Sequence, residues 1–115
     1  MAIQTHRDAL SLIFAALADP TRRALLARLA LGPTDVSELM RPFALSQPTI
    51  SKHLKVLEHA GLVERSQDAQ RRPRRLVAKP LRSVSRWVEP YRRHWEQRLD
   101  SLDSYLRTIQ DGKKR

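Results

Sequence analysis

The 115-residue sequence contains no cysteine, which removes several kinds of chemistry at once. The chain can form no disulfide, no thiolate metal site and no cysteine redox switch. Glycine is also scarce, and three glycines leave no glycine-rich loop of the kind that cradles phosphates. Two pairs of carboxylates, Asp100 with Asp103 and Glu64 with Asp68, look like ordinary surface charge. We therefore expect neither an enzyme nor a bound cofactor.

Long apolar runs are missing as well. No run approaches the roughly 18 residues that a membrane-spanning helix needs, and the first residues lack the apolar core of a signal peptide. This pattern predicts a soluble, cytoplasmic protein with no membrane partner. Aromatic residues make up only 5% of the chain, but hydrophobic residues reach 41%, which is sufficient for one compact domain with a modest core.

Acidic residues are outnumbered by basic ones, 12 against 22, so the net charge is +10. The excess is uneven, because residues 1–40 are balanced while residues 41–79 and 80–115 are both strongly basic. Such a charge predicts a polyanionic partner or an anionic surface. A membrane surface is disfavoured because the arginines gather on a hairpin and not opposite an exposed apolar face.

Residues 45–62 carry the strongest local pattern. Ile50, Leu54 and Leu57 recur at the spacing of one face of an α-helix. Ser46 is a suitable N-cap, and Gly61 can end the helix because it tolerates a positive φ. We therefore predict an amphipathic helix over this stretch, with its apolar face turned toward a core.

The opposite face of this helix is short, polar and cationic. Side chains of this kind can reach base edges in a DNA groove while lysines bind phosphates. An ordinary solvated helix surface has the same composition, so the helix alone leaves both interpretations open. The candidate DNA-binding residues here are Ser46, Gln47, Thr49, Ser51, Lys52 and Lys55.

Three shorter helices are predicted before the central one. The first spans Thr5 to Ala18, with Thr5 and Asp8 spaced like a capping box. The second begins with Asp19 as N-cap and Pro20 at its first position. The third begins at Asp35, and a tight turn joins it to the central helix, so residues 35–60 form a helix-turn-helix.

After Gly61 the apolar period changes from that of a helix to that of a strand. Residues 62–65 and 75–78 read as two short strands, and the polar residues 66–74 between them as a hairpin tip. We call residues 62–79 the wing. Like charges crowd its tip and return strand, which favours contact with a phosphate backbone over a merely solvated loop. The candidate wing contacts are Arg71, Arg72, Arg74 and Arg75.

The last predicted element is a helix from Pro80 to about Gln110, followed by a frayed basic tail at 111–115. Apolar residues step by three or four along it, and Pro90 predicts a kink or a break near Glu89. A helix of about 30 residues spans roughly 45 Å, too long to be buried by so small a domain. The remaining apolar stripe should therefore meet another chain.

Taken together, these elements predict a mainly α, single-domain winged helix-turn-helix over residues 1–110. The sequence resembles the ArsR-type family of bacterial transcriptional repressors in two segments, ALADPTRRALLARL (16–29) and LSQPTISKHLKVLEHAGLVERS (45–66). The resemblance extends from about Leu10 to about Leu106. It implies a homodimer that pairs through its first and last helices and binds a two-fold symmetric operator. It further implies DNA contact by Gln47, Thr49, Ser51 and Lys52, with the wing arginines beside the minor groove.

The resemblance also implies which residues form the dimer interface. Founding members of the family sense metals through cysteines in the helix before the recognition helix, where this chain has only Val36-Ser37-Glu38-Leu39. Here the terminal aromatics either pack the dimer or line an apolar gap for an organic effector, whose identity is unknown. The predicted dimer residues are Leu10, Phe14, Trp87, Tyr91, Trp95, Leu99, Leu102 and Leu106.

The histidines offer no obvious metal site. His53 and His59 fall on different faces of the central helix, and His6 and His94 lie far from them in sequence. His53 is at the edge of the apolar stripe, where we expect it to pack or form a hydrogen bond and not to touch a base. The predicted function is a metal-independent, sequence-specific repressor, autoregulated by its own concentration if it has no effector. The competing interpretation is a helix-mediated interaction module whose basic surface binds nucleic acid non-specifically.

Overall fold

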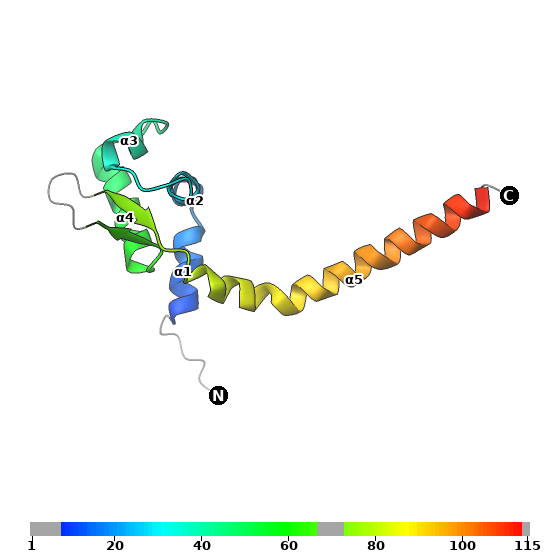
Figure 1. The fold of residues 1–115 in the computed structure, drawn as a ribbon. Coiled ribbons are helices and arrows are strands. Elements are labelled where there is room, and N and C mark those ends of the chain that lie inside the picture. The colour runs from blue at the N-terminus through cyan, green and yellow to red at the C-terminus, as the bar shows by residue number, and fades with distance from the viewer. Residues whose placement is uncertain (1–7, 67–72, 114–115) are drawn as a thin grey trace. The chain divides into compact units, whose positions relative to one another are not determined.

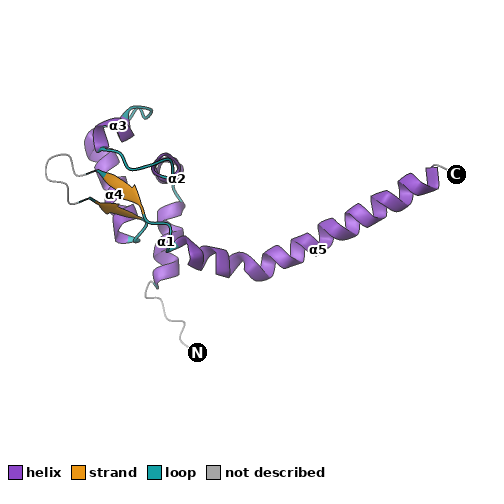
Figure 2. Ribbon diagram, viewed as in Figure 1, coloured by secondary structure: helices purple, strands orange, loops and turns teal. Residues whose placement is uncertain are grey.

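The structure, a computed structural model, describes residues 8–66 and 73–113 of the chain. The chain forms two compact units, residues 1–84 and residues 85–115. The described residues form five helices and one hairpin. Figures 1 and 2 draw them as ribbons. In chain order the elements are α1 (Ala9–Leu17), α2 (Pro20–Leu29), α3 (Val36–Met40), α4 (Gln47–His59), β1 (Val63–Arg65), β2 (Arg74–Leu76) and α5 (Leu81–Lys113).

Four helices begin at a side chain that accepts a hydrogen bond from the first turn. Asp19, Asp35 and Ser46 cap α2, α3 and α4, as the sequence predicts. The first helix differs from the prediction, since Asp8 is extended (ψ 173°) and accepts from the backbone N–H of Ser11 at 2.7 Å. Asp8 is therefore the N-cap itself, and α1 begins at Ala9 and not at Thr5, which lies outside the described residues.

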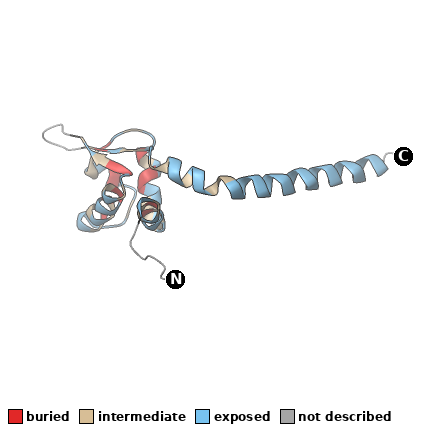
Figure 3. Cartoon of the chain, turned by 90° about the horizontal axis from the view of Figure 1, so that it is seen from below, coloured by how far each residue is buried: buried red, intermediate tan, exposed pale blue. Residues whose placement is uncertain are grey.

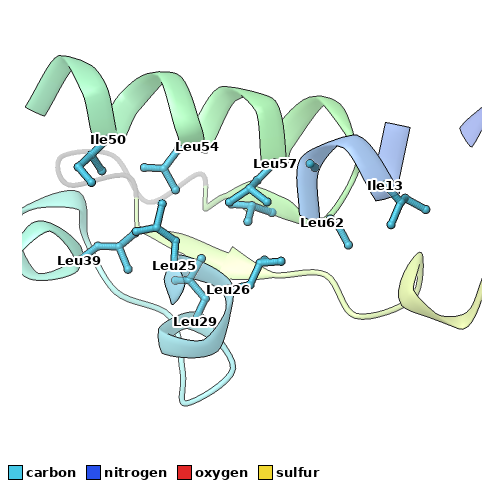
Figure 4. Close-up of a cluster of buried hydrophobic side chains, with 11 residues drawn as sticks. Ile13, Leu25, Leu26, Leu29, Leu39, Ile50, Leu54, Leu57 and Leu62 are labelled. Atoms are coloured by element: carbon cyan, nitrogen blue, oxygen red, sulfur yellow. The ribbon is translucent and has the colours of Figure 1, made fainter. Parts of the chain in front are cut away.

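The core of the first unit is aliphatic and draws on every element of that unit. The central stripe of α4 is fully buried, as predicted: Ile50, Leu54 and Leu57 expose 1% or less of their surface. Figure 4 shows these side chains turned toward Leu25 of α2 and Leu39 of α3. Gly61 follows α4 with φ +78°, the conformation predicted for the residue that ends this helix. The face of α4 opposite this stripe is consequently left at the surface.

The two strands form an antiparallel hairpin in which Val63 pairs with Leu76 and Arg65 with Arg74. β1 begins one residue later than predicted, and β2 begins one residue earlier. Arg74 therefore belongs to β2 and not to the hairpin tip. Thr34, in the loop before α3, adds a bridge to Arg74 through two backbone hydrogen bonds of 3.1 and 2.9 Å. The base of the wing is thereby tied to the helix-turn-helix.

The last helix is longer than predicted. It continues without a break through Pro90 and ends at Lys113, so residues 111–113 are helical and not a frayed tail. A proline removes only one backbone hydrogen bond, and the helix can continue where the neighbouring turns remain paired. Figure 3 shows that residues 91–112 are exposed around the whole helix. In the described residues, no helix combines the length and apolar character needed to span a membrane.

Candidate nucleic-acid interface

The N-terminal end of α4 is fixed by both its cap and its buried stripe. The hydroxyl of Ser46 accepts from the backbone N–H of Thr49 at 3.4 Å and lies 2.9 Å from the Thr49 hydroxyl. Pro48 lies in the first turn of α4, where its lack of a backbone N–H leaves no hydrogen bond of the helix unmade. With Ile50 and Leu54 buried on one side, the direction of the outer side chains is set by the packing of the helix.

The outer face of α4 presents the predicted mixture of polar and cationic groups. Gln47, Lys52 and Lys55 are exposed, while Thr49 and Ser51 are half-buried. The Thr49 hydroxyl is shared with the cap, which makes it a less free donor than Ser51 or Gln47. These groups lie within about two helical turns. The amide and the hydroxyl suit base edges, and the two ammonium groups suit phosphates.

His53 forms a hydrogen bond, which is one of the two possibilities that the sequence leaves for it. Its Nδ1 lies 3.3 Å from Nη1 of Arg22, at the start of α2. The same guanidinium donates from Nε to the Ala16 carbonyl at 2.6 Å and from Nη2 to the Ala15 carbonyl at 2.9 Å. One side chain thus connects the end of α1, the start of α2 and the middle of α4.

Asp19 completes this junction. Its carboxylate accepts from the backbone N–H groups of Thr21 at 2.8 Å and Arg22 at 3.2 Å. Desolvation raises the pKa of this carboxyl. The hydrogen bonds from the Arg22 and Thr21 N–H groups, together with smaller electrostatic contributions from His53 and Arg22, lower the pKa by more than desolvation raises it. The net effect is a pKa below the ordinary value of 3.8, so the carboxylate is charged at neutral pH.

The wing arginines do not share one environment. Arg71 and Arg72 lie outside the described residues, and Arg75 is exposed and pairs with Glu64 of β1. Arg74 corrects the sequence prediction, since it is buried and its Nε donates to Glu58 of α4 at 2.9 Å. A guanidinium held by a carboxylate beneath the wing is poorly placed to bind a phosphate, and we remove Arg74 from the candidate DNA contacts.

Glu58 was not singled out by the sequence, yet it joins α4 to both strands of the wing. One of its carboxylate oxygens accepts from Arg74 at 2.9 Å and from Arg65 at 3.2 Å. The available signal was the alternation of β2, where Arg74 and Leu76 share the inward face and Arg75 points outward. An inward arginine requires a partner, and an acidic residue near the end of α4 supplies it.

The predicted dimer residues are grouped on α1 and along α5. On α1, Leu10 is half-buried and Phe14 is 36% exposed, although Ile13 beside them is in the core. On α5, Trp87 and Tyr91 lie side by side with ring centroids 5.1 Å apart. The large apolar side chains of α5 that are exposed are Trp87, Tyr91, Trp95, Leu99, Leu102, Tyr105, Leu106 and Ile109.

Within residues 8–66 and 73–113, no three His, Asp or Glu side chains gather closely enough to hold an ion. His53 is engaged with Arg22, which competes for its Nδ1 lone pair.

Residues 19–65, which include α2, the helix-turn-helix and β1, match the model of a family described as "Bacterial regulatory protein, arsR family". A crystal structure of an ArsR family transcriptional regulator is 39% identical, with a TM-score of 0.70, and the match covers 77% of this chain and 98% of that one. The chain belongs to the ArsR family. Its fold is a winged helix-turn-helix, and members of the family are regulators and not enzymes.

Curated relatives match this chain over part of its length. An HTH-type transcriptional regulator of Mycobacterium tuberculosis is 58% identical over 48 residues, covering 42% of this chain and 45% of the relative. The transcriptional repressor SdpR of Bacillus subtilis is 37% identical over 51 residues, covering 44% and 57%. The chain thus spans about half the length of the curated relatives that it matches.

A structure of a possible ArsR-family regulator of Mycobacterium bovis extends the comparison to α5. That protein is a homodimeric winged helix-turn-helix DNA-binding domain. It is 26% identical, with a TM-score of 0.60, and the match covers 84% of this chain and 95% of that one. The likeness between the two ArsR-family chains therefore includes most of the described residues.

Proposed function

We propose that this ArsR-family chain is a homodimeric repressor that binds DNA with sequence specificity. The observation that carries the proposal is the outer face of α4, where Lys52 stands opposite a fully buried stripe and Gln47 and Ser51 flank it. A helix of this width enters the major groove of B-DNA, where each base pair presents a distinct pattern of donors and acceptors. In this proposal Gln47, Ser51 and Lys52 read bases, and Lys55 binds a phosphate.

The wing supplies a second contact in the proposed complex. Glu58 fastens both strands to α4 through Arg74 and Arg65, so the hairpin and the recognition helix move together. Arg75 is exposed on the outer side of β2, and the sequence places Arg71 and Arg72 before it. These three arginines bind phosphates or enter the minor groove in the proposal, which adds affinity that depends on salt.

The second half of the proposal is the homodimer. On α5, Trp95, Leu99 and Leu102 expose 52 to 60% of their surfaces, far more than a stripe of this size would in a folded monomer. Phe14 and Leu10 add an apolar patch on α1. The homodimeric relative from Mycobacterium bovis supports the same assembly here. Two copies would bring two α4 helices to a two-fold symmetric operator.

We further propose that the repressor works in the cytoplasm without a metal trigger. Thiolate sensing is impossible in a chain with no cysteine, and His53 is already bound to Arg22. Release from DNA would then depend on an organic effector, on a partner protein or on repressor concentration alone. Repression of its own promoter is the simplest form of the last alternative.

A second candidate function is a helix-mediated interaction module that binds nucleic acid only through its charge. It is favoured by the strongly basic composition and by the exposed α5 stripe, which another protein could cover. Non-specific charge binding predicts equal affinities for any duplex of the same length.

The experiment that separates the two begins by selecting a preferred site for the wild-type protein from a random DNA library. The selected duplex, its scrambled version and an RNA duplex of the same length are then titrated at two salt concentrations. A repressor prefers the selected DNA over the scrambled DNA by at least about 10³-fold at both salts. A charge-only module binds all three alike, and its affinity falls with salt in parallel for each.

A further inference from the structure

The orientation of α4 is set by more than its apolar stripe. Arg22 donates to the Ala16 and Ala15 carbonyls at 2.6 and 2.9 Å, so its guanidinium plane is fixed on the last turn of α1. Asp19 accepts from the backbone N–H of the same arginine at 3.2 Å and fixes where its side chain begins. The remaining nitrogen, Nη1, is aimed at Nδ1 of His53 at 3.3 Å.

This last contact needs a hydrogen-bond acceptor on the imidazole. A guanidinium has only N–H donors, so Nδ1 of His53 must accept and cannot carry a proton. A side chain lacking an acceptor at this position loses the contact even if its volume is similar.

The position of His53 along α4 gives the contact its consequence. It directly follows Ser51 and Lys52, and it lies at the edge of the stripe formed by Ile50 and Leu54. An aliphatic stripe resists translation of a helix away from the core, but it allows small rotations about the helix axis because its contacts are non-directional. A hydrogen bond at the edge of the stripe is directional and opposes such rotation.

We propose that Arg22 and His53 are positioning residues, which set the rotation of α4 and thereby aim Ser51 and Lys52 at base edges. Side-chain tips lie about 5–6 Å from a helix axis, so a rotation of about 10° moves them by about 1 Å. That displacement breaks a base-specific hydrogen bond, whose tolerance is a few tenths of an ångström. Contacts of lysines and wing arginines with phosphates tolerate it, since charge attraction falls slowly with distance.

The proposal rests on the proposed function, because it concerns how the same surface reads DNA. It predicts a specific failure, in which the preference for one sequence is lost while general DNA affinity is retained. A residue that merely stabilises the fold would lower the affinity for every duplex and the thermal midpoint together. The ratio of the two affinities therefore distinguishes positioning from stability.

The variants are chosen to retain or remove the acceptor. In His53→Asn the side-chain carbonyl can replace Nδ1, whereas His53→Leu keeps apolar bulk and offers no acceptor. The matched control is His59→Leu, six residues later on the exposed end of α4. Arg22→Lys provides a second variant from the other side of the contact, because one ammonium cannot reach two carbonyls and an imidazole at once.

Binding of each variant to the DNA selected by the wild type, and to its scrambled version, is measured by fluorescence anisotropy alongside thermal unfolding. We expect His53→Leu and Arg22→Lys to reduce the preference for selected DNA by about tenfold or more, within the usual range for one misread base pair. Their affinity for scrambled DNA should stay within about twofold of wild type, as should both affinities of His53→Asn and His59→Leu.

Three results would overturn the proposal. A preference within twofold of wild type in His53→Leu means that the contact does not aim α4. An equal loss on both DNAs means that it only stabilises the fold, and an equal defect in His53→Asn means that the acceptor is not the cause. Failure of the proposed function itself would show differently, since the wild type would then prefer no sequence at all, and the positioning role would fall with it.

Discussion

Adjacent residues of β2 have different roles because successive side chains of a strand face opposite sides. Arg74 faces inward, with 10% of its side chain exposed, and contacts Glu58. Arg75 faces outward, with 61% exposed, and contacts Glu64. Removing one partner of a largely buried pair leaves an uncompensated charge, whereas an exposed pair contributes little.

This difference gives the first prediction. Arg74→Ala should lower the free energy of unfolding by about 2–3 kcal/mol, because Glu58 then lacks its main partner in a partly dry site. Arg75→Ala should change it by no more than about 0.5 kcal/mol. Urea unfolding of the two variants at pH 7 tests this, and equal losses would contradict the assignment of Arg74 to the interior.

The second prediction concerns Asp19, whose pKa in the folded chain lies below 3.8. A lowered pKa contributes stability that is complete above the unfolded value of about 3.9 and is lost as the pH falls through the folded value. Asp19→Ala should therefore be less stable than wild type at pH 7, and the difference should shrink below about pH 4. Urea unfolding at pH 7, 5 and 3 measures it; a constant difference would contradict the charged cap.

At the residue scale, the sequence predicts what depends on local chemistry. The caps Asp19, Asp35 and Ser46 were identifiable because capping needs only a short polar side chain and its own first turn. The partners of Arg74 and His53 were not, since Glu58 and Arg22 are brought to them by the packing of separate elements. Long-range polar contacts leave no periodic signal in one sequence.

At the scale of the element, α4 and the wing have separable roles in the proposed DNA complex. Base contacts carry sequence information, while phosphate contacts supply affinity for any duplex. In the proposal Ser51 and Lys52 read bases, and the sequence predicts that Arg71 and Arg72, which lie outside the described residues, contact the phosphate backbone.

The third prediction tests this separation. Ser51→Ala and Lys52→Ala should each reduce the preference for selected over scrambled DNA by about 1–3 kcal/mol, the range for a well-formed base contact. Arg71→Ala combined with Arg72→Ala should instead weaken binding to both DNAs and reduce the salt dependence. Titrations at two salt concentrations measure both effects. If the double variant binds like wild type, the wing is only a solvated loop.

Elements were predictable where the apolar period is long and regular. The stripe of α4 and the repeat of α5 fix their helices within a few residues, because many positions support one interpretation. The three-residue strands are shorter than predicted, and each begins one residue away from its predicted start, since so short a pattern does not fix its own ends. Pro90 suggested a kink or a break. The helix is unbroken, because a proline can bend a helix of 33 residues without ending it.

At the scale of the whole molecule, the exposed stripe of α5 is the feature that demands a partner. The fourth prediction is that Leu99→Asp combined with Leu102→Asp dissociates the homodimer, because two carboxylates per chain would be buried in the seam. The matched control is Ser101→Asp with Ser104→Asp, on the opposite side of the same turns. Sedimentation at micromolar concentration should give a monomer for the first variant and a dimer for the control. A monomeric wild type would contradict the assembly.

The fifth prediction concerns regulation. DNA binding by the wild type should not respond to zinc, cadmium, arsenite or thiol oxidants, because the chain has no cysteine to bind or react with them. Operator titrations with each agent at up to tenfold excess, after chelation, measure this. A reversible and saturable loss of affinity with one metal, abolished by mutation of His94 or His59, would contradict it.

In the proposed complex, two copies of this chain read one DNA site together. The wild type is titrated, at one salt concentration, with the complete selected site, a duplex retaining only one half-site, and a scrambled duplex. Joint reading predicts the tightest binding for the complete site, much weaker binding for the half-site, and a stoichiometry of two chains per complete site. Equal affinities for all three duplexes would contradict the claim.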